Sequence, residues 1–524
     1  ALLEGARHSA NRAGLVVFPL KPPLAPDASL TIGFEHHGRY PDGLSKNGGG
    51  EGTFILPSSV VLTGFTPSFA PLIGFQDGIG VDDENKTDAK EFAEDFYVGQ
   101  TDSFLGARSP FTTKITVTGP ADFRFHSVGE LISEEQREGK RTVVWSSDYP
   151  VNFFNVIGGR WVEKRGEGTA IFHHPAHGAN IDEMLLALNG ARKYYSAWFA
   201  PFPWKELKLN EFAGLSGYAQ GFPTNITFSE SIGFLTRSDS TDHAAFAVTA
   251  HESAHQWWGN LIAPGEGPGG NLLSEGTSHF STILLMDQVL GPAARMEFCR
   301  RIENRYNIGR QADSERPLVK IDGSRPGDTT VTYDKAGMVF WMLLHHMGRD
   351  RMLSGIQEFF RRYAQNRDHP VLQDFLEVLR PFAADPAAFD AFTRQWFHEV
   401  VVPEYRLTET KLTHDPTRGT WIASARIENL GTGVMPLEIA ATRGERVSSN
   451  GKFNQDHQDQ RITLTLGSKT SNSISIRCPF QPDRLVVDPD LLVLQLRRKL
   501  SETPLGSTSE PLEVQESARE TPVR

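Results

Sequence analysis

Residues 251–255 read His-Glu-Ser-Ala-His, so two imidazoles stand four positions apart with a carboxylate directly after the first. On a helix, residues four apart lie on one face, and the rings of His251 and His255 then face the same way. Two histidines with a more distant glutamate form a zinc-binding set that leaves a fourth position open for water. Glu252 is then placed to accept a proton from this metal-activated water as the water attacks a carbonyl carbon. A buried structural pair of histidines is the alternative interpretation.

The expected third ligand comes from a second segment with helical periodicity. Residues 272–276, Leu-Leu-Ser-Glu-Gly, open this helix, and apolar residues follow at helical spacing: Phe280, Leu284 and Leu285. A glutamate in the first turn of a helix is common because the helix dipole favours it, so Glu275 alone would be weak evidence. The preceding loop at 259–270 can return the chain to the metal, which makes Glu275 the leading candidate. Glu266, within this Pro/Gly-rich loop, is the second candidate.

The composition excludes some classes of protein. The chain has 524 residues, 39% of them apolar, with 53 Lys and Arg against 64 Asp and Glu and a formal net charge of −11. Because the charge is spread along the chain, no basic face indicates a nucleic-acid partner. No run comes near the ~18 consecutive apolar residues of a membrane span. The chain starts at Ala1 without a signal-peptide pattern, so we expect a processed piece whose compartment the sequence does not record.

The elements that must position these residues belong to a chain of roughly three domains, at about 100–200 residues for each domain. Residues 1–165 are β-rich, because apolar and polar side chains alternate around Ile115 and Val117 and Gly/Pro turns punctuate the stretch. The acidic, polar segment 74–100 is expected to be a long surface loop.

Residues 166–400 are expected to form one α+β domain. A helix starts after Asn180, which can cap it, and the periodicity is mostly helical from residue 242 onward. Residues 401–497 return to a period of two and form a small β domain. Residues 498–524 are rich in Ser, Thr, Glu and Pro, and we expect a disordered tail there.

The stretch His-Glu-Ser-Ala-His-Gln-Trp-Trp-Gly-Asn at 251–260, with Leu-Ser-Glu-Gly at 273–276, resembles the gluzincin metallopeptidases of the aminopeptidase N type. The resemblance runs to about residue 490 and implies an α+β multidomain fold. Its order would be an N-terminal β domain, a thermolysin-like catalytic domain and a small C-terminal β-sandwich. It also implies one Zn²⁺ per chain on His251, His255 and Glu275, with Glu252 as the general base.

The same resemblance draws attention to residues 331–337, Val-Thr-Tyr-Asp-Lys-Ala-Gly. The family carries a tyrosine just before an acidic-Lys-Gly run, and its hydroxyl stabilises the oxyanion of the tetrahedral intermediate. Tyr333 matches that position, and a phenol donor aimed at developing negative charge is an effective catalytic group. A packing role is the alternative for this tyrosine.

Two departures from the family pattern affect the interpretation. Nineteen residues separate His255 from Glu275 where most members have eighteen, and Ser274 occupies the expected position. The family's Gly-Ala-Met-Glu-Asn motif, whose glutamate anchors the substrate's free amine, corresponds here to Gly217, Tyr218, Ala219, Gln220 and Gly221. A neutral amide thus replaces the anchoring carboxylate, with Glu230 as another acidic group nearby in sequence. Exopeptidase and endopeptidase action both stay open.

Both departures are similar to a bacterial subgroup in which the peptidase domain is joined to an ABC-type permease. The stretches Ser229–Phe234 and Val487–Asp490 carry this likeness. It implies a permease or membrane tether outside this chain, and an extracytoplasmic location, periplasmic or at the cell surface, in preference to a cytoplasmic one.

The sequence therefore predicts zinc-dependent hydrolysis of peptide bonds, and the resemblance implies removal of N-terminal residues from peptides. Another divalent metal in the site is an alternative. The rival function is a non-catalytic peptide-binding or transporter-associated domain on a peptidase-like fold. Glu252 and Tyr333 argue against this rival because a binding module needs no general base, whereas the missing amine anchor argues for it.

Overall fold

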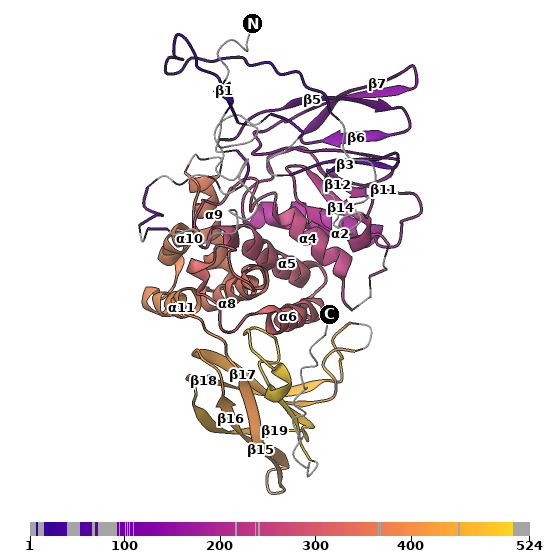
Figure 1. Cartoon of the computed structure of the whole chain (residues 1–524). Coiled ribbons are helices and arrows are strands. Elements are labelled where there is room, and N and C mark those ends of the chain that lie inside the picture. Colours follow the sequence, from indigo (N-terminus) through magenta and orange to yellow (C-terminus); the bar gives the residue numbers. More distant parts are fainter. Residues whose placement is uncertain are drawn as a thin grey trace, which may run out of the picture. The chain divides into compact units, whose positions relative to one another are not determined.

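The structure is a computed structural model, and its described residues are 7–8, 15–38, 53–64, 69–71 and, with short gaps, 92–506. The gaps are residues 94, 100, 102, 104, 108, 215–216, 236, 239–240, 365, 367 and 449–450. Two compact units make up the chain, Ala1–Val400 and Val401–Arg524 (Figure 1). The surface loop predicted at 74–100 lies mostly outside the described residues, and the boundary predicted after residue 165 stays a prediction.

Antiparallel sheets form the N-terminal part of the first unit, as predicted. One sheet has, in spatial order, the strands β3 (Phe54–Ile55), β4 (Ser59–Leu62), β9 (Val156–Gly159) and β6 (Arg124–Ser127). Another has the strands β5 (Lys114–Pro120), β8 (Lys140–Ser146) and β7 (Glu130–Arg137), and the short β1 (Arg7–His8) pairs with β2 (Val16–Val17). The alternation around Ile115 and Val117 lies in β5, so this strand prediction is confirmed.

A five-stranded mixed sheet follows in the first unit. Its spatial order is β10 (Val162–Arg165), β11 (Thr169–His173), β12 (Leu207–Phe212), β14 (Asn225–Ser229) and β13 (Ala219–Gln220). The central strands β11, β12 and β14 are parallel and fully buried, whereas β13 runs antiparallel to β14 at one end. Apolar residues of these strands pack on the inner face of helix α2 (Ile181–Trp198).

Helix α2 begins where the sequence predicts, but the expected side-chain cap is wrong. Asn180 makes no capping hydrogen bond. Its Nδ2 donates to the Gly233 carbonyl at 2.6 Å and its Oδ1 accepts from the Ser238 N–H at 2.9 Å. Asn180 therefore ties the start of α2 to the segment after β14, which local sequence could not indicate.

Helices dominate the rest of the first unit, as the periodicity from residue 242 predicts. The longer ones are α4 (Ala244–Ala254), α5 (Glu275–Val289), α6 (Pro292–Gly309), α8 (Ala336–Met347), α9 (Arg349–Tyr363), α10 (Leu372–Leu379) and α11 (Pro386–His398). Short turns join them: α3 (Glu230–Gly233), η1 (Gly270–Leu273), η2 (Leu318–Lys320), α7 (Asp328–Thr330), η3 (Val331–Lys335) and η4 (Arg380–Phe382). Helix α4 packs between α2 and α5, and α5 packs against α8 (Figure 1).

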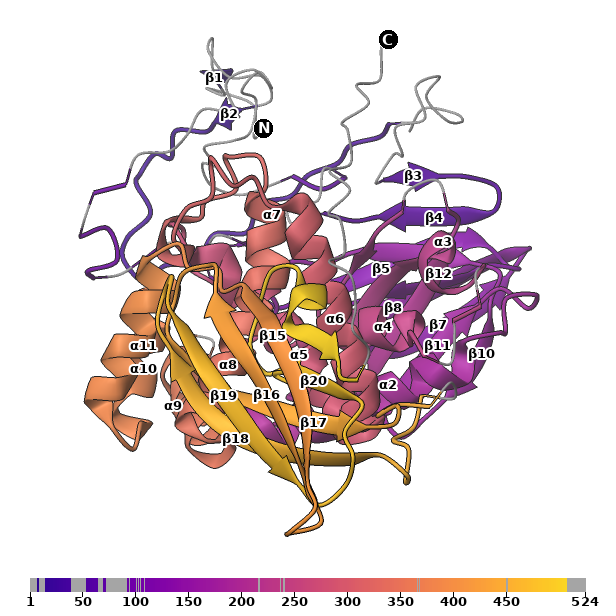
Figure 2. The same ribbon diagram turned by 90° about the horizontal axis from the view of Figure 1, so that it is seen from below.

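The second unit consists of two antiparallel sheets, in agreement with the predicted small β domain. One contains β15 (Tyr405–Asp415), β16 (Thr420–Asn429) and β19 (Ser471–Cys478), which lie side by side in Figure 2. The other contains β18 (Gln458–Leu466), β17 (Met435–Arg443), β20 (Arg484–Val487) and β21 (Glu502–Pro504). Buried residues alternate with half-buried ones along β16 and with exposed ones along the end of β19, as expected for strands with one covered face.

The expected disordered tail is wrong for its first residues. Arg498–Ser501 forms the short helix η5, and β21 pairs antiparallel with β20. Arg498 also forms an ion pair with the buried Asp488 carboxylate at 3.1 Å. The prediction of disorder rested on the scarcity of large apolar side chains. Strand pairing through the backbone and an ion pair do not require such side chains, so the composition of the segment could not indicate this structure. Residues 507–524 lie outside the described part of the chain.

Candidate metal centre

The histidine motif lies at the C-terminal end of α4. His251 and Glu252 belong to its last turn, and His255 follows Ala254 directly with helical backbone angles of φ −60° and ψ −16°. The two side chains therefore stay on one face, as the spacing predicts, and their Nε2 atoms lie 3.2 Å apart. All three motif residues are buried, with relative exposures of 8%, 7% and 9%.

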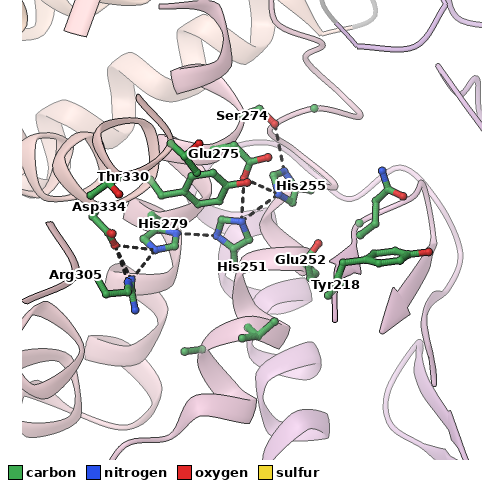
Figure 3. Close-up of a pocket in the computed structure, with 18 of the residues that line it drawn as sticks. Tyr218, His251, Glu252, His255, Ser274, Glu275, His279, Arg305, Thr330 and Asp334 are labelled. Carbon is green, nitrogen blue, oxygen red and sulfur yellow. Dashed lines mark hydrogen bonds and ion pairs between the residues drawn. The ribbon is translucent and has the colours of Figure 1, made fainter. Parts of the chain in front are cut away.

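Glu275 reaches the two imidazoles from the first turn of α5. Its Oε2 lies 3.1 Å from Nε2 of His251 and 3.4 Å from Nε2 of His255 (Figure 3). Three ligands bonded at about 2.0–2.1 Å in a tetrahedron lie roughly 3.3–3.4 Å from one another. The donor set and its spacing therefore fit a zinc ion. The short helix η1 and Ser274 directly precede Glu275.

Glu252 is a second carboxylate close to the same histidines. One of its oxygens and one nitrogen of each histidine lie within 4.8 Å of one another. Distance therefore admits either glutamate as the third ligand, but Oε2 of Glu275 makes the closer contacts. Burial raises the pKa of the Glu252 carboxyl group. The neighbouring imidazoles outweigh the opposing effect of burial at Glu275 and hold its pKa well below the usual value. The two carboxylates thus have different environments.

The second ring nitrogens fix how the imidazoles are oriented. Nδ1 of His255 lies 3.0 Å from the Trp258 carbonyl oxygen. A carbonyl only accepts, so Nδ1 carries a proton, and Nε2 on the Glu275 side is the nitrogen left to bind a metal ion. Nδ1 of His251 lies 3.0 Å from Nδ1 of His279, which is on α5. The sequence analysis did not single out His279, although it stands four residues after Glu275 on the same helix face.

Tyr333 lies beside the histidines in the π-helical turn η3. Its ring is nearly parallel to that of His251, with the centroids 5.7 Å apart. Burial, followed by the Glu275 carboxylate, raises the pKa of the phenol, which keeps its proton available for donation. Lys335 in the same turn is buried and forms an ion pair with the buried Glu315 at 2.6 Å. This pair anchors the turn.

Two glycines let the Tyr333 turn approach α5. A Cβ on Gly276 would lie 2.8 Å from Cβ of Ala336 and 3.0 Å from the Thr332 carbonyl oxygen. A Cβ on Gly337 would lie 2.8 Å from Cβ of His279. The Glu-Gly and Ala-Gly pairs in the sequence are therefore explained by close contact between α5, η3 and α8.

A cavity of about 640 Å³ opens over these residues. The residues that line it include Tyr218, Ala219, Gln220 and Gly221, together with both histidines, Glu252, Glu275 and Tyr333. Gly217, the first residue of the predicted substrate loop, is exposed and does not line the cavity. The structure thus brings most of the predicted site residues to one cleft.

The backbone at Gly221 lies directly on α4. A Cβ there would be 2.5 Å from the Glu252 carbonyl oxygen and 2.8 Å from Cβ of His255. Side chains that follow the histidine motif hold this loop: Asn260 donates to the Gly221 carbonyl at 2.8 Å, and Gln256 donates to the Phe222 carbonyl at 2.9 Å. The loop is therefore positioned by the same segment that carries the histidines.

Glu266, the second candidate for the third ligand, and Glu230, the second acidic group near the substrate loop, lie outside the cleft. Neither Glu266 nor Glu230 lines the cavity. Glu230 accepts the Gly214 N–H at 2.8 Å and forms, with His177 and the buried Glu211, another group of His and Glu side chains within 4.8 Å. Glu211 is already bonded to His177 and to the His174 N–H, so its oxygens have protein partners.

Part of the chain is similar to known proteins. Residues 195–396 match the Peptidase family M1 domain. Aminopeptidase M1-C of Oryza sativa subsp. japonica is 25% identical over 248 residues, which are 45% of this chain and 27% of that protein. Human endoplasmic reticulum aminopeptidase 1 is 23% identical over 241 residues, which are 42% of this chain and 24% of that protein. This chain thus spans about a quarter of the length of the curated relatives it matches.

A likeness among solved structures supports the fold. The crystal structure of Legionella pneumophila aminopeptidase A in complex with aspartic acid superposes with a TM-score of 0.50 and 17% identity. The match covers 74% of this chain and 44% of that one. The fold is thus the predicted α+β multidomain arrangement. Among the described residues, none of the helices has the length and apolar character needed to cross a membrane.

The first prediction tests the third ligand. Glu275→Ala removes an oxygen that contacts both imidazoles, so the purified protein should lose its zinc. Glu266→Ala removes a carboxylate outside the cavity and should leave the zinc content unchanged. Elemental analysis after dialysis measures both variants. Zinc that persists in Glu275→Ala and disappears in Glu266→Ala would show that the third ligand is wrongly assigned.

The second prediction concerns packing at Gly221. Gly221→Ala forces its methyl group against the α4 backbone and should lower the free energy of unfolding by about 1–3 kcal/mol, as overpacking of a dense region does. Gly217→Ala is the matched control, because its Cβ would have its nearest neighbour at 3.7 Å. Urea unfolding followed by tryptophan fluorescence gives both values. Equal stability of the two variants would contradict the inferred contact.

Proposed function

We propose that this chain is a zinc-dependent peptidase that removes N-terminal residues from peptides. The observation that carries the proposal is the convergence of Nε2 of His251, Nε2 of His255 and Oε2 of Glu275 at 3.1–3.4 Å. Glu252 and Tyr333 line the same cavity. The match to the Peptidase family M1 domain and the aminopeptidase names of the relatives support the reaction class.

The proposed roles follow from the positions of the side chains. Zn²⁺, when bound, lowers the pKa of a water molecule and polarises the scissile carbonyl group. Glu252 accepts a proton from the attacking water and passes it to the leaving amine; its raised pKa suits both transfers. Tyr333 donates its hydroxyl hydrogen to the oxyanion, because its own raised pKa keeps the phenol protonated.

The substrate backbone is proposed to bind along β13. This strand is last in the order of its sheet among the described residues, and its paired neighbour is β14. An extended peptide can add to such an edge through main-chain hydrogen bonds. Because Ala219 and Gln220 also line the cavity, a peptide paired with β13 would pass over Glu252 and the metal ligands.

The amino terminus of the substrate is proposed to meet Gln220. Glu230 cannot take this role from its present position, because it lies outside the cavity and accepts the Gly214 N–H. An amide oxygen binds an ammonium group less strongly than a carboxylate does. We therefore propose a weaker preference for free N-termini than in an enzyme with a glutamate at this position.

Placement outside the cytoplasmic membrane, next to an ABC-type permease, is part of the proposal. It is supported only by the sequence likeness of Ser229–Phe234 and Val487–Asp490 to a bacterial subgroup. A non-catalytic peptide-binding role is not proposed, because Glu252 and Tyr333 both face the cavity that holds the candidate ligands.

The third prediction tests the general base. Glu252→Gln keeps the shape of the side chain and removes its ability to accept a proton. The variant should keep its zinc but lose hydrolysis by roughly 10²–10⁴-fold, the usual contribution of general acid–base catalysis. Elemental analysis and a peptide assay on the same sample measure the two properties. Hydrolysis at the parental rate would exclude Glu252 as the base.

The fourth prediction tests recognition of the amine. Gln220→Glu should raise kcat/KM for peptides with a free N-terminus by a factor equivalent to about 1–2 kcal/mol, because the new contact is charge-assisted. The acetylated form of the same peptide is the control and should gain nothing. If the parent already rejects the acetylated peptide completely and Gln220→Glu changes nothing, another residue holds the amine.

A further inference from the structure

His279 links the candidate metal ligand His251 to a charged pair on the far side. Its Nδ1 lies 3.0 Å from Nδ1 of His251. Its Nε2 lies 3.1 Å from Nη2 of Arg305 and 3.7 Å from Oδ1 of Asp334 (Figure 3). Arg305 and Asp334 are joined to each other at 2.6 Å. His251, His279, Arg305 and Asp334 thus form a row in which each side chain has a neighbour for a hydrogen bond.

The row permits one arrangement in which Arg305 donates to His279. A guanidinium group only donates, so Nε2 of His279 must then accept, and the ring proton must be on Nδ1. That proton is donated to Nδ1 of His251, whose own proton must be on Nε2. In this arrangement Nε2 of His251 donates to Oε2 of Glu275, 3.1 Å away. Its lone pair is not available to a metal ion.

A metal ion on Nε2 of His251 requires the opposite arrangement. The proton of His251 must then be on Nδ1, where it is donated to Nδ1 of His279. His279 must therefore carry its proton on Nε2, which can no longer accept from Arg305. The nearest acceptor for it is Oδ1 of Asp334. Both imidazoles stay neutral in the two arrangements, so the change is one of tautomer and not of protonation.

We infer that His279 is a positioning residue, which holds His251 in its metal-binding tautomer by accepting from Nδ1 and donating to Asp334. The inference rests on the proposed metal site. Histidine ligands generally donate their second N–H to a carbonyl or carboxylate, which fixes the tautomer. His255 follows this rule through the Trp258 carbonyl. The partner of His251 is His279, whose Nδ1 can either donate or accept. A hydrogen bond from Nε2 of His279 to Asp334 would make Nδ1 the acceptor.

Metal binding is then coupled to the Tyr333 turn. Asp334 follows Tyr333 in η3 and its side chain is mostly buried, so a hydrogen bond from His279 has to draw these two groups closer than 3.7 Å. Arg305 keeps its bonds to Oδ1 of Asp334, at 3.0 Å from Nε and 2.6 Å from Nη2, while it releases His279. One turn thus carries both the proposed oxyanion donor and the group that orients a ligand.

Two substitutions separate hydrogen bonding from packing. His279→Asn keeps an acceptor oxygen near the position of Nδ1, whereas His279→Leu fills similar space without an acceptor. We expect His279→Leu to bind zinc 10- to 100-fold more weakly, the usual effect of losing such a partner, and His279→Asn to bind it far more tightly than His279→Leu. Competition with a chromophoric chelator gives the affinities of the folded proteins. Parental affinity in His279→Leu, or equal losses in both variants, would overturn the inference.

The tautomer itself can be observed by NMR of the full chain with ¹⁵N-labelled histidine. Signals of the His279 ring are assigned by their disappearance in His279→Asn. Zinc should move the ring proton of His279 from Nδ1 to Nε2, and Asp334→Asn should weaken this response. Zinc bound in the expected amount with the His279 proton on Nδ1 would overturn the inference alone. A parental protein that binds no zinc would overturn the proposed metal centre as well.

Discussion

The site depends on one contact, that of a buried carboxylate on α5 with two buried imidazoles on α4. The desolvation of Glu275 is costly, and it is offset only if Oε2 stays within reach of both rings, as it does at 3.1 and 3.4 Å. The end of α4 and the beginning of α5 must therefore be held together by the rest of the first unit. The buried Trp258, which follows the motif, contributes to this by donating its indole N–H to Ser281 of α5 at 3.1 Å.

Three segments approach the helices around the site so closely that only glycine fits at the points of contact. Gly221 lets the cleft loop touch α4, Gly276 lets the Tyr333 turn touch α5, and Gly337 gives room to His279. Dense packing transmits any displacement to its neighbours, so each of these contacts fixes a functional group at a distance. The cleft strand and the proposed oxyanion donor are thus positioned by backbone contact with the helices that carry the candidate ligands.

The sequence predicts what depends on local spacing. The face shared by His251 and His255 follows from helix geometry, and the start of α5 at Glu275 follows from its apolar periodicity. Contacts between distant segments leave no such pattern. His279, for example, is an ordinary polar position on a helix until Asp334 is placed next to it, 55 residues later in the chain. The partners of Asn180 and the strand at Glu502–Pro504 were missed for the same reason.

The roles proposed for Glu252 and Glu275 differ although the side chains are of one type. Glu275 contacts both imidazoles, which stabilise its charged form, and its pKa falls. Glu252 points from the same buried helix end into the cavity, where loss of water outweighs the more distant imidazoles, and its pKa rises. A carboxylate that stays charged suits a metal ligand, whereas one that gains and loses a proton readily suits a general base. The proposed division of roles therefore follows from distance to the two ring nitrogens, and not from the identity of the residue.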